Sequence, residues 1–248
     1  HMDRSRHIGD PSFYAVPVES IISKKRAREL KKTINFKSAS SYKSMSPDDF
    51  LEESKDTTHY SIIDEDGNAV SNTYTLGYSF GSGVTIPGTG VLMNNHMNNF
   101  AYRYGDKSIR GRTASPANKF DSGKRPMSTM TPVMMFNREG ELQLITGSPG
   151  GAAIPAAVLR VITGVIDFNL GIGEATMLPR IHKDWPYEDL DYESTASSDV
   201  IAILQNLGHK MEASKTMGST QSIHIKDGFN HGYADLRRPN AGVAIQTH

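Results

Sequence analysis

Alternating apolar and polar positions predict β-strands in three parts of the chain. Two of these parts read as hairpins, because Asp66-Gly67 and Arg138-Glu139-Gly140 are turn sequences between alternating segments. The expected strands are His59–Ile63 with Ala69–Leu76, the hairpin from Val133 to Thr146, and the closing strands Ser222–Lys226 and Tyr233–Asp235.

Apolar residues at helical spacing predict helices around these strands. The expected helices are Val18–Ile34, a short helix from Ser46 to Glu53 that begins at Pro47, Ala152–Phe168, and Ser198–Leu207, which a serine caps and Gly208 ends. The polar segment from Lys37 to Ser46 reads as a linker. This order of elements predicts an α+β fold, with an αββα sandwich as its layered form.

The charge composition indicates which classes of binding partner the sequence favours. Acidic and basic residues balance, with 27 of each among 248 residues, so nothing global points to nucleic acid or to an anionic membrane surface. Any anion binding should be local, at the basic stretch Arg103–Arg125, and the alternative interpretation, which the sequence favours, is a solvated loop. Cysteine is absent and the nine histidines show no metal-ligand spacing, so we expect no metal and no cofactor. No apolar run approaches the ~20 residues that span a bilayer.

The N-terminus reads as artificial. His1-Met2 resembles a cloning remnant, and Asp3-Arg4-Ser5-Arg6 reads like the middle of a longer protein. The missing signal peptide therefore leaves the compartment open.

A candidate nucleophile lies where the linker meets the first predicted strand, at Asp56-Thr57-Thr58. A threonine hydroxyl inside a chain is a poor nucleophile unless a base accepts its proton. If the bond between Asp56 and Thr57 is cut, the new α-amine of Thr57, with an ordinary pKa of about 7.7–8.0, can be that base. Taken alone, the two threonines favour an ordinary strand start.

A glycine-rich turn, Gly147-Ser148-Pro149-Gly150-Gly151, lies between a predicted strand and the apolar helix. Backbone N–H groups at a helix start suit an oxyanion, and paired glycines leave room for close approach. The Lys-Ser/Thr ending of a phosphate-binding loop is absent. Taken alone, this segment favours a plain strand-to-helix turn.

Together these segments resemble the γ-glutamyltranspeptidase family of N-terminal-nucleophile hydrolases. The matching motifs occur in the family's order across nearly the whole chain. They are Asp3-Arg4-Ser5-Arg6-His7-Ile8-Gly9-Asp10-Pro11, Thr57-Thr58-His59-Tyr60-Ser61, Gly67-Asn68-Ala69-Val70, Thr73-Tyr74-Thr75-Leu76, Phe80-Gly81-Ser82-Gly83, Met93-Asn94-Asn95, Lys124-Arg125-Pro126-Met127-Ser128-Thr129-Met130, the glycine-rich turn, Pro179-Arg180, and Met217-Gly218-Ser219-Thr220-Gln221-Ser222. The ordered set favours the functional interpretation of both the threonine and the glycine motif.

The resemblance implies a precursor that cuts itself into a large and a small subunit. Residues 3–56 would be the tail of the large subunit, residues 57–248 a complete small subunit, and the large subunit would be the partner. The family fold is an αββα sandwich. Thr57 would first attack the carbonyl of Asp56 and then a γ-amide carbonyl, forming an acyl-enzyme. Gly150 and Gly151 would stabilise the oxyanion, and Thr75 would orient the nucleophile.

The resemblance also places the substrate pocket, with departures from the family pattern. The family commonly holds the γ-glutamyl group with an Asn, a Gln and an Asp, which align with Gly77, His96 and Asn99. Ser128 and Thr129 keep both hydroxyls of the family's serine pair. Because Asn99 lacks the charge that would pair with a substrate ammonium, the acyl group is open between γ-glutamyl, as in glutathione, and glutaryl. Related members with altered pockets include cephalosporin acylase-like proteins and a capsule depolymerase.

Two further hypotheses compete with this function. The chain could be a catalytically silent fragment that folds and binds partners, although Thr57, Thr75, Gly150 and Gly151 are intact. It could also be a small enzyme complete in itself, which the absence of half the family's pocket disfavours. By resemblance the protein is periplasmic or secreted, with a cytoplasmic location left open.

Overall fold

The computed structural model describes residues 2–40, 57–101, 115–184, 188–214 and 216–246. Its helices are α1 (Met2–His7), α2 (Val18–Ile21), α3 (Lys24–Thr33), α4 (Ile154–Ile166), α5 (Ile172–Met177) and α6 (Ser198–Asn206). Its strands are β1 (Thr58–Ile63), β2 (Ala69–Tyr74), β3 (Val133–Phe136), β4 (Leu142–Thr146), β5 (Ile181–His182), β6 (Asp189–Glu193), β7 (Lys210–Ser214), β8 (Gln221–Lys226) and β9 (Phe229–Ala234). Several predicted features lie outside the described residues. They are the helix expected from Ser46 to Glu53, most of the linker, Asp56, and the basic stretch before residue 115.

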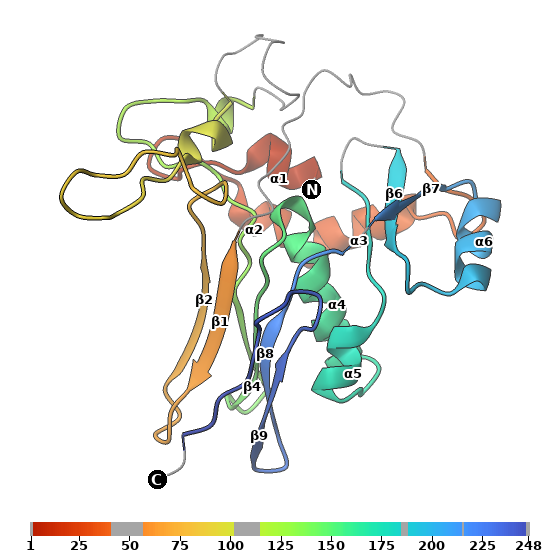
Figure 1. Cartoon of the computed structure of the whole chain (residues 1–248). Helices are drawn as coiled ribbons and strands as arrows, with labels where there is room; N and C mark the ends of the chain where they lie inside the picture. Colours follow the sequence, from red (N-terminus) through yellow and green to blue (C-terminus); the bar gives the residue numbers. More distant parts are fainter. Residues whose placement is uncertain (1, 41–56, 102–114, 185–187, 215, 247–248) are drawn as a thin grey trace.

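Two antiparallel sheets form the centre of the molecule. The hairpin β1–β2 packs against a four-stranded sheet with the order β3-β4-β8-β9. Hydroxyl groups join them: Ser61 Oγ donates to the carbonyl of Gln221 at 2.8 Å, and Ser71 Oγ donates to the carbonyl of Thr146 at 3.1 Å. Figure 1 shows α4 and α5 on the other side of the four-stranded sheet. The layers are therefore helix, sheet, sheet.

The core lies between the four-stranded sheet and the helical layer. Buried apolar side chains from β4, α4 and α5 form it: Leu144, Val161, Val165, Ile172 and Ala175. Gly164 lets the two helices approach, because a Cβ there would lie 2.8 Å from the Cβ of Ala175. The apolar spacing that predicted a helix from Ala152 to Phe168 thus corresponds to α4, which begins after a short 3₁₀ turn.

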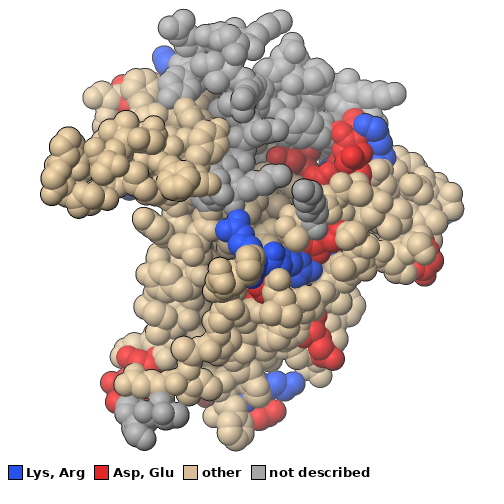
Figure 2. All heavy atoms as spheres, viewed as in Figure 1, with Lys and Arg blue, Asp and Glu red and all other residues tan. Residues whose placement is uncertain are grey.

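The expected α+β fold is confirmed, and the described residues supply three of the four layers of an αββα sandwich. The outer face of β1–β2 is apolar and open to solvent, with Tyr60 45%, Ile62 51% and Val70 44% exposed. The described part of the chain places no helix on that face. Figure 2 shows this side of the molecule covered largely by uncharged residues, including the loop that follows β2.

The prediction of one continuous helix from Val18 to Ile34 is wrong. The segment Val18–Ile34 divides into α2 and α3, because Ser23 has an extended backbone and its hydroxyl accepts the N–H of Arg26 at 3.0 Å. This serine starts a new helix where the apolar spacing alone suggested a continuous one.

The other predicted elements differ mainly at their ends. β2 stops two residues before Leu76, and β9 begins four residues before Tyr233. Gly208 follows α6 with φ at +92°, as its expected role at the helix end requires. Ser197 occupies the N-cap position of α6, but its hydroxyl bonds the Asp199 side chain instead of capping a backbone N–H.

The sheet β5-β6-β7 and helix α5 were not expected from the sequence. β6 and β7 pair in parallel and carry charged residues such as Asp189 and Lys210, so they lack the apolar alternation that marks a strand. Within the described residues, no helix combines the length and the apolarity needed to cross a membrane.

Candidate active site

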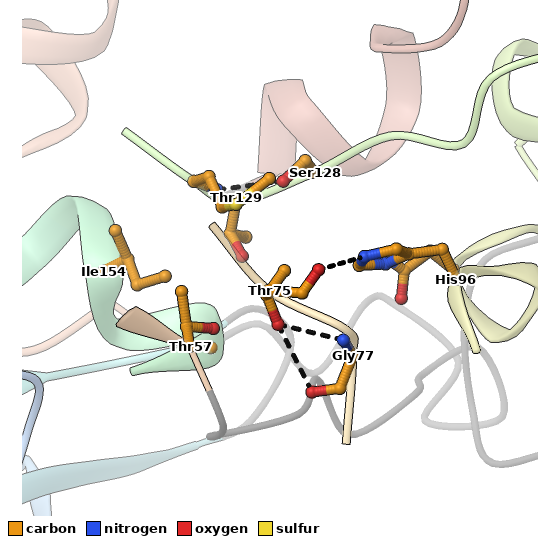
Figure 3. Close-up of a pocket in the computed structure, with 10 residues that line it drawn as sticks. Thr57, Thr75, Gly77, His96, Ser128, Thr129 and Ile154 are labelled. Atoms are coloured by element: carbon orange, nitrogen blue, oxygen red, sulfur yellow. Dashed lines mark hydrogen bonds between the residues drawn. The ribbon is translucent and has the colours of Figure 1, made fainter. Parts of the chain in front are cut away.

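One open pocket collects residues that are far apart in the sequence. Its lining residues are Thr57, Thr75, Gly77, His96, Asn99, Ser128, Thr129, Met130, Gly151 and Ile154. These include every catalytic or substrate residue predicted from the sequence except Gly150. Figure 3 shows the side chains of Thr57, Thr75 and Thr129 grouped around this space.

Strand register brings Thr57 and Thr75 together. In the hairpin Thr58 pairs with Tyr74, so Thr57 and Thr75 lie at the same end, one residue beyond the last pair. The N–H of Gly77 donates to Thr75 Oγ1 at 2.9 Å and fixes that side chain. Arg238 Nη1 donates to the carbonyl of Thr57 at 3.0 Å and holds the main chain at the start of β1.

His96 and Asn99 form one hydrogen-bonded unit on the pocket wall. The carbonyl of Thr75 can only accept, so His96 Nε2 donates to it at 3.0 Å (Figure 3). In a neutral imidazole the other nitrogen is then an acceptor, and Asn99 Nδ2 lies 3.2 Å from His96 Nδ1. This arrangement orients Asn99, whose amide carries no charge, against the His96 ring.

Gly77 lines the pocket through its backbone alone. Its φ is +94°, and a Cβ would lie 1.8 Å from Asn95 Oδ1, which accepts the N–H of Tyr78 at 3.0 Å. A side chain at position 77 would therefore displace Asn95 and the loop start. The residue can contact a ligand only by its main chain.

The glycine-rich turn enters the pocket from β4. Gly150 has φ +136° and Gly151 has φ +57°, conformations that residues with side chains rarely adopt. Gly151 starts the 3₁₀ turn before α4, so the first N–H groups there have no partner within the helix. Those N–H groups are donors at the positive end of a helix.

A second loop packs behind this turn. A Cβ on Gly150 would lie 2.9 Å from the Cα of Gly218, and the N–H of Ser219 donates to Ser148 Oγ at 2.9 Å. Gly150 therefore packs against the loop around Gly218, directly before Gly151, which lines the pocket.

A network of buried ion pairs holds the loop around Gly218 in place. This network was not predicted from the sequence. Arg180 and Asp235 are 2% and 0% exposed and form an ion pair at 2.7 Å. Arg180 Nη1 donates to the carbonyl of Met217 at 2.7 Å, and Asp235 Oδ2 accepts the N–H of Thr220 at 2.9 Å. Glu193 accepts the N–H of Met217 at 2.9 Å and pairs with Arg237. No local signal in the sequence marks it, because Glu193 follows Asp189 and Asp191 closely and Arg237 adjoins Arg238.

The apolar part of the pocket was also missed. Met130 and Ile154 line it, and Ile154 is 1% exposed at the first position of α4. Their positions directly after Ser128-Thr129 and after the glycine-rich turn were the signal that could have identified them. Among the described residues, no group of His, Cys, Asp or Glu side chains is arranged to hold a metal ion.

His59 lies beneath the glycine-rich turn and is 5% exposed. A Cβ on Gly147 would lie 2.2 Å from its ring. Ser61 donates its proton to Gln221, so His59 Nε2 donates to Ser61 Oγ at 3.2 Å and Nδ1 accepts from Thr73 Oγ1 at 2.8 Å. Burial lowers the pKa of His59 to about 4 from an ordinary value of 6.5.

This pKa predicts acid sensitivity. Between pH 6.5 and 4 the unfolded chain binds a proton at position 59 that the folded chain does not bind. The free energy of unfolding therefore falls as pH falls through this range, by at most about 3 kcal/mol. Urea denaturation from pH 4 to 7 measures the slope. His59→Gln should flatten it, whereas His231→Gln, at an exposed position of β9, should not. An equal slope in all three proteins would refute this assignment.

Comparison with known proteins identifies the same family that the sequence motifs resemble. A family model described as gamma-glutamyltranspeptidase matches residues 1–245. The glutathione hydrolase proenzyme of Escherichia coli is 38% identical over 239 residues, which cover 96% of this chain and 41% of that protein. The chain therefore spans about two fifths of the length of that relative.

Two solved structures have the same fold. The T380A mutant of gamma-glutamyltranspeptidase from Helicobacter pylori is 37% identical with a TM-score of 0.68, covering 73% of this chain and 100% of that chain. The cephalosporin acylase from Bacillus halodurans is 26% identical with a TM-score of 0.81, covering 99% of this chain and 43% of that chain.

Proposed function

Since the chain belongs to the γ-glutamyltranspeptidase family, we propose that the whole protein is an autoprocessed threonine enzyme that cleaves or transfers γ-glutamyl amides such as glutathione. The observation that supports this most is the pocket, where Thr57 meets Thr75, Gly151 and the hydroxyl pair Ser128-Thr129. The name of the Escherichia coli relative, a glutathione hydrolase proenzyme, supports both the substrate and the precursor.

Autoprocessing is the first proposed use of the hydroxyl. Thr57 Oγ attacks the carbonyl carbon of Asp56, the C–N bond breaks, and the acyl group moves from nitrogen to oxygen. Water then hydrolyses this ester and leaves Asp56 as a carboxylate and Thr57 with a free α-amine. Residues 3–56 become the tail of the large subunit, and residues 57–248 the small subunit. In support, 73% of this chain matches the whole Helicobacter chain, close to the share that residues 57–248 represent.

Turnover is the second proposed use. The α-amine of Thr57 accepts the hydroxyl proton while Oγ attacks the γ-carbonyl carbon, and Thr75 orients the side chain. N–H groups of Gly150 and Gly151 stabilise the oxyanion, the amine product leaves with the proton, and an acyl-enzyme remains. Water or an amino acceptor then attacks this ester and restores Thr57.

Substrate recognition divides between the two walls of the pocket. We assign the α-carboxylate to the hydroxyls of Ser128 and Thr129, and the α-amino end to the wall formed by Gly77, His96 and Asn99. Because the amide of Asn99 carries no charge, Asn99 would bind an ammonium group through its dipole only. The large subunit of the same precursor would complete the pocket as the partner.

Asn99→Asp tests this assignment. The change puts a carboxylate beside the α-amino end, so the ratio of kcat/KM for a γ-glutamyl anilide over a glutaryl anilide should rise about tenfold, equivalent to ~1.4 kcal/mol. Asn98→Asp is the matched control, because its exposed neighbouring position gains the same charge outside the pocket lining. An equal ratio in both variants would remove Asn99 from the α-amino site.

Comparing the two anilides on the full-length wild-type protein tests the function itself. Turnover of the γ-glutamyl anilide with release of the aniline supports the proposal. Turnover of the glutaryl anilide alone would move the protein toward an acylase specificity. Turnover of neither, with a correctly folded and complete protein, would favour the silent fragment.

A further inference from the structure

The N-terminal segment holds the loop that leads to Ser128 and Thr129. The carboxylate of Asp10 is buried, and three donors of Arg125 bond to it: the backbone N–H at 2.9 Å, Nε at 3.0 Å and Nη2 at 2.9 Å. Asp10 Oδ1 also accepts the N–H of Ser12 at 3.0 Å. Because Asp10 bonds both the main chain and the side chain of Arg125, it fixes the backbone three residues before Ser128.

Two more contacts join the N-terminal segment to the segment that begins at Ser115. Ser115 Oγ donates to the carbonyl of Arg6 at 2.8 Å. Gly9 lies against Ala117, where a Cβ would come within 1.9 Å of the carbonyl oxygen, so no other residue fits there. In Figure 1 the red N-terminal segment runs beside the yellow-green segment that contains these residues.

Asn118 connects this contact to the other wall of the pocket. It is 1% exposed, its Nδ2 donates to the carbonyl of Asn99 at 2.6 Å, and its Oδ1 accepts the N–H of Met127 at 3.0 Å. One buried side chain thus sets the spacing between the Asn99 wall and the start of the Ser128-Thr129 wall. The N-terminal segment packs directly against the loop that carries Asn118.

We propose that Asp10 is a positioning residue for substrate binding, acting through Arg125 on the placement of Ser128 and Thr129. This inference rests on the proposed function for the identity of the substrate. In the processed protein Asp10 belongs to one subunit and Arg125 to the other, so a contact between subunits sets the carboxylate-binding wall. The Arg125 hydrogen bonds hold the pKa of Asp10 well below its usual range, so the contact persists at every working pH.

Asp10→Asn in the full-length protein tests the proposal. The amide replaces one acceptor oxygen by a donor that faces the donors of Arg125, so the loop loses its fixed position. KM for the γ-glutamyl anilide should rise about tenfold while kcat changes less than about twofold, the pattern of lost ground-state binding. Hydrogen–deuterium exchange of a peptide covering residues 125–131 should become faster. Arg125→Lys, which keeps the charge but loses the forked geometry, should show a smaller effect of the same kind.

Asp3→Asn is the matched control. The carboxylate of Asp3 accepts hydrogen bonds from Nε and Nη2 of Arg26 at 3.1 and 2.7 Å, with the same paired geometry as Asp10 and Arg125. Both Asp3 and Arg26, however, lie in the N-terminal segment. This variant should keep the wild-type KM and exchange rates. Equal KM and equal exchange in Asp10→Asn and Asp3→Asn would overturn the proposal. If the wild-type protein turns over no anilide, the proposed function fails, and the exchange measurement alone still decides whether Asp10 positions the loop.

Discussion

Replacing Thr57 with alanine is expected to lower turnover of the γ-glutamyl anilide by at least about 10⁴-fold, because no other hydroxyl has its base on the same residue. The backbone should remain in place. Its carbonyl is held by Arg238 at 3.0 Å, and β1 begins only at the next residue. The loss should therefore reflect chemistry and not folding, which a thermal denaturation curve of the variant can check.

Thr57→Ser is the control for this experiment. Serine keeps the hydroxyl and the α-amine, so it should retain measurable activity and should still form a covalent acyl-enzyme with a slow donor. Detection of that ester by mass spectrometry on residue 57 identifies the nucleophile. An alanine variant that keeps more than a tenth of wild-type turnover would mean that another residue attacks the substrate.

Replacing Gly150 with alanine is expected to lower kcat by about 10²–10³-fold, the effect of losing one oxyanion donor. At φ +136° the new Cβ would lie 2.9 Å from the Cα of Gly218. That atom cannot move freely, because its loop is fixed by the ion pair of Arg180 and Asp235 and by Glu193. The turn must shift instead, and its N–H groups shift with it.

Gly140→Ala separates this effect from backbone strain. Gly140 has φ +86° in the β3–β4 turn, and a Cβ there would meet nothing within 4 Å. This variant should lose some stability but keep the wild-type kcat. If Gly150→Ala folds and its kcat stays within about twofold of wild type, the glycine-rich turn does not bind the oxyanion.

Local patterns in the sequence predicted the elements that surround the nucleophile. The turn pair Asp66-Gly67 sets the register of β1 and β2, and this register places Thr57 beside Thr75. The glycine-rich turn was predictable for a similar reason, since positive φ values and close approach require glycine. Features that depend on a few neighbouring residues are therefore visible without a structure.

Features that depend on distant residues were not visible. Arg180 meets Asp235 across 55 positions, and Asp10 meets Arg125 across 115. No spacing rule predicts such pairs, because the fold brings them together. The role of His59 was also not visible in the sequence, because a histidine in a strand has no distinctive pattern. Only the structure shows that Gly147 packs against its ring and that burial lowers its pKa. The sheet β5-β6-β7 was missed because its polar strands lack apolar alternation.

The intact mass of the full-length protein under denaturing conditions, after incubation near neutral pH, tests the central claim most directly. The account predicts two species that divide between Asp56 and Thr57, and a single uncut species for Thr57→Ala. A single wild-type mass that Thr57→Ala does not change would contradict autoprocessing at this bond, and with it the function of Thr57 as an N-terminal nucleophile.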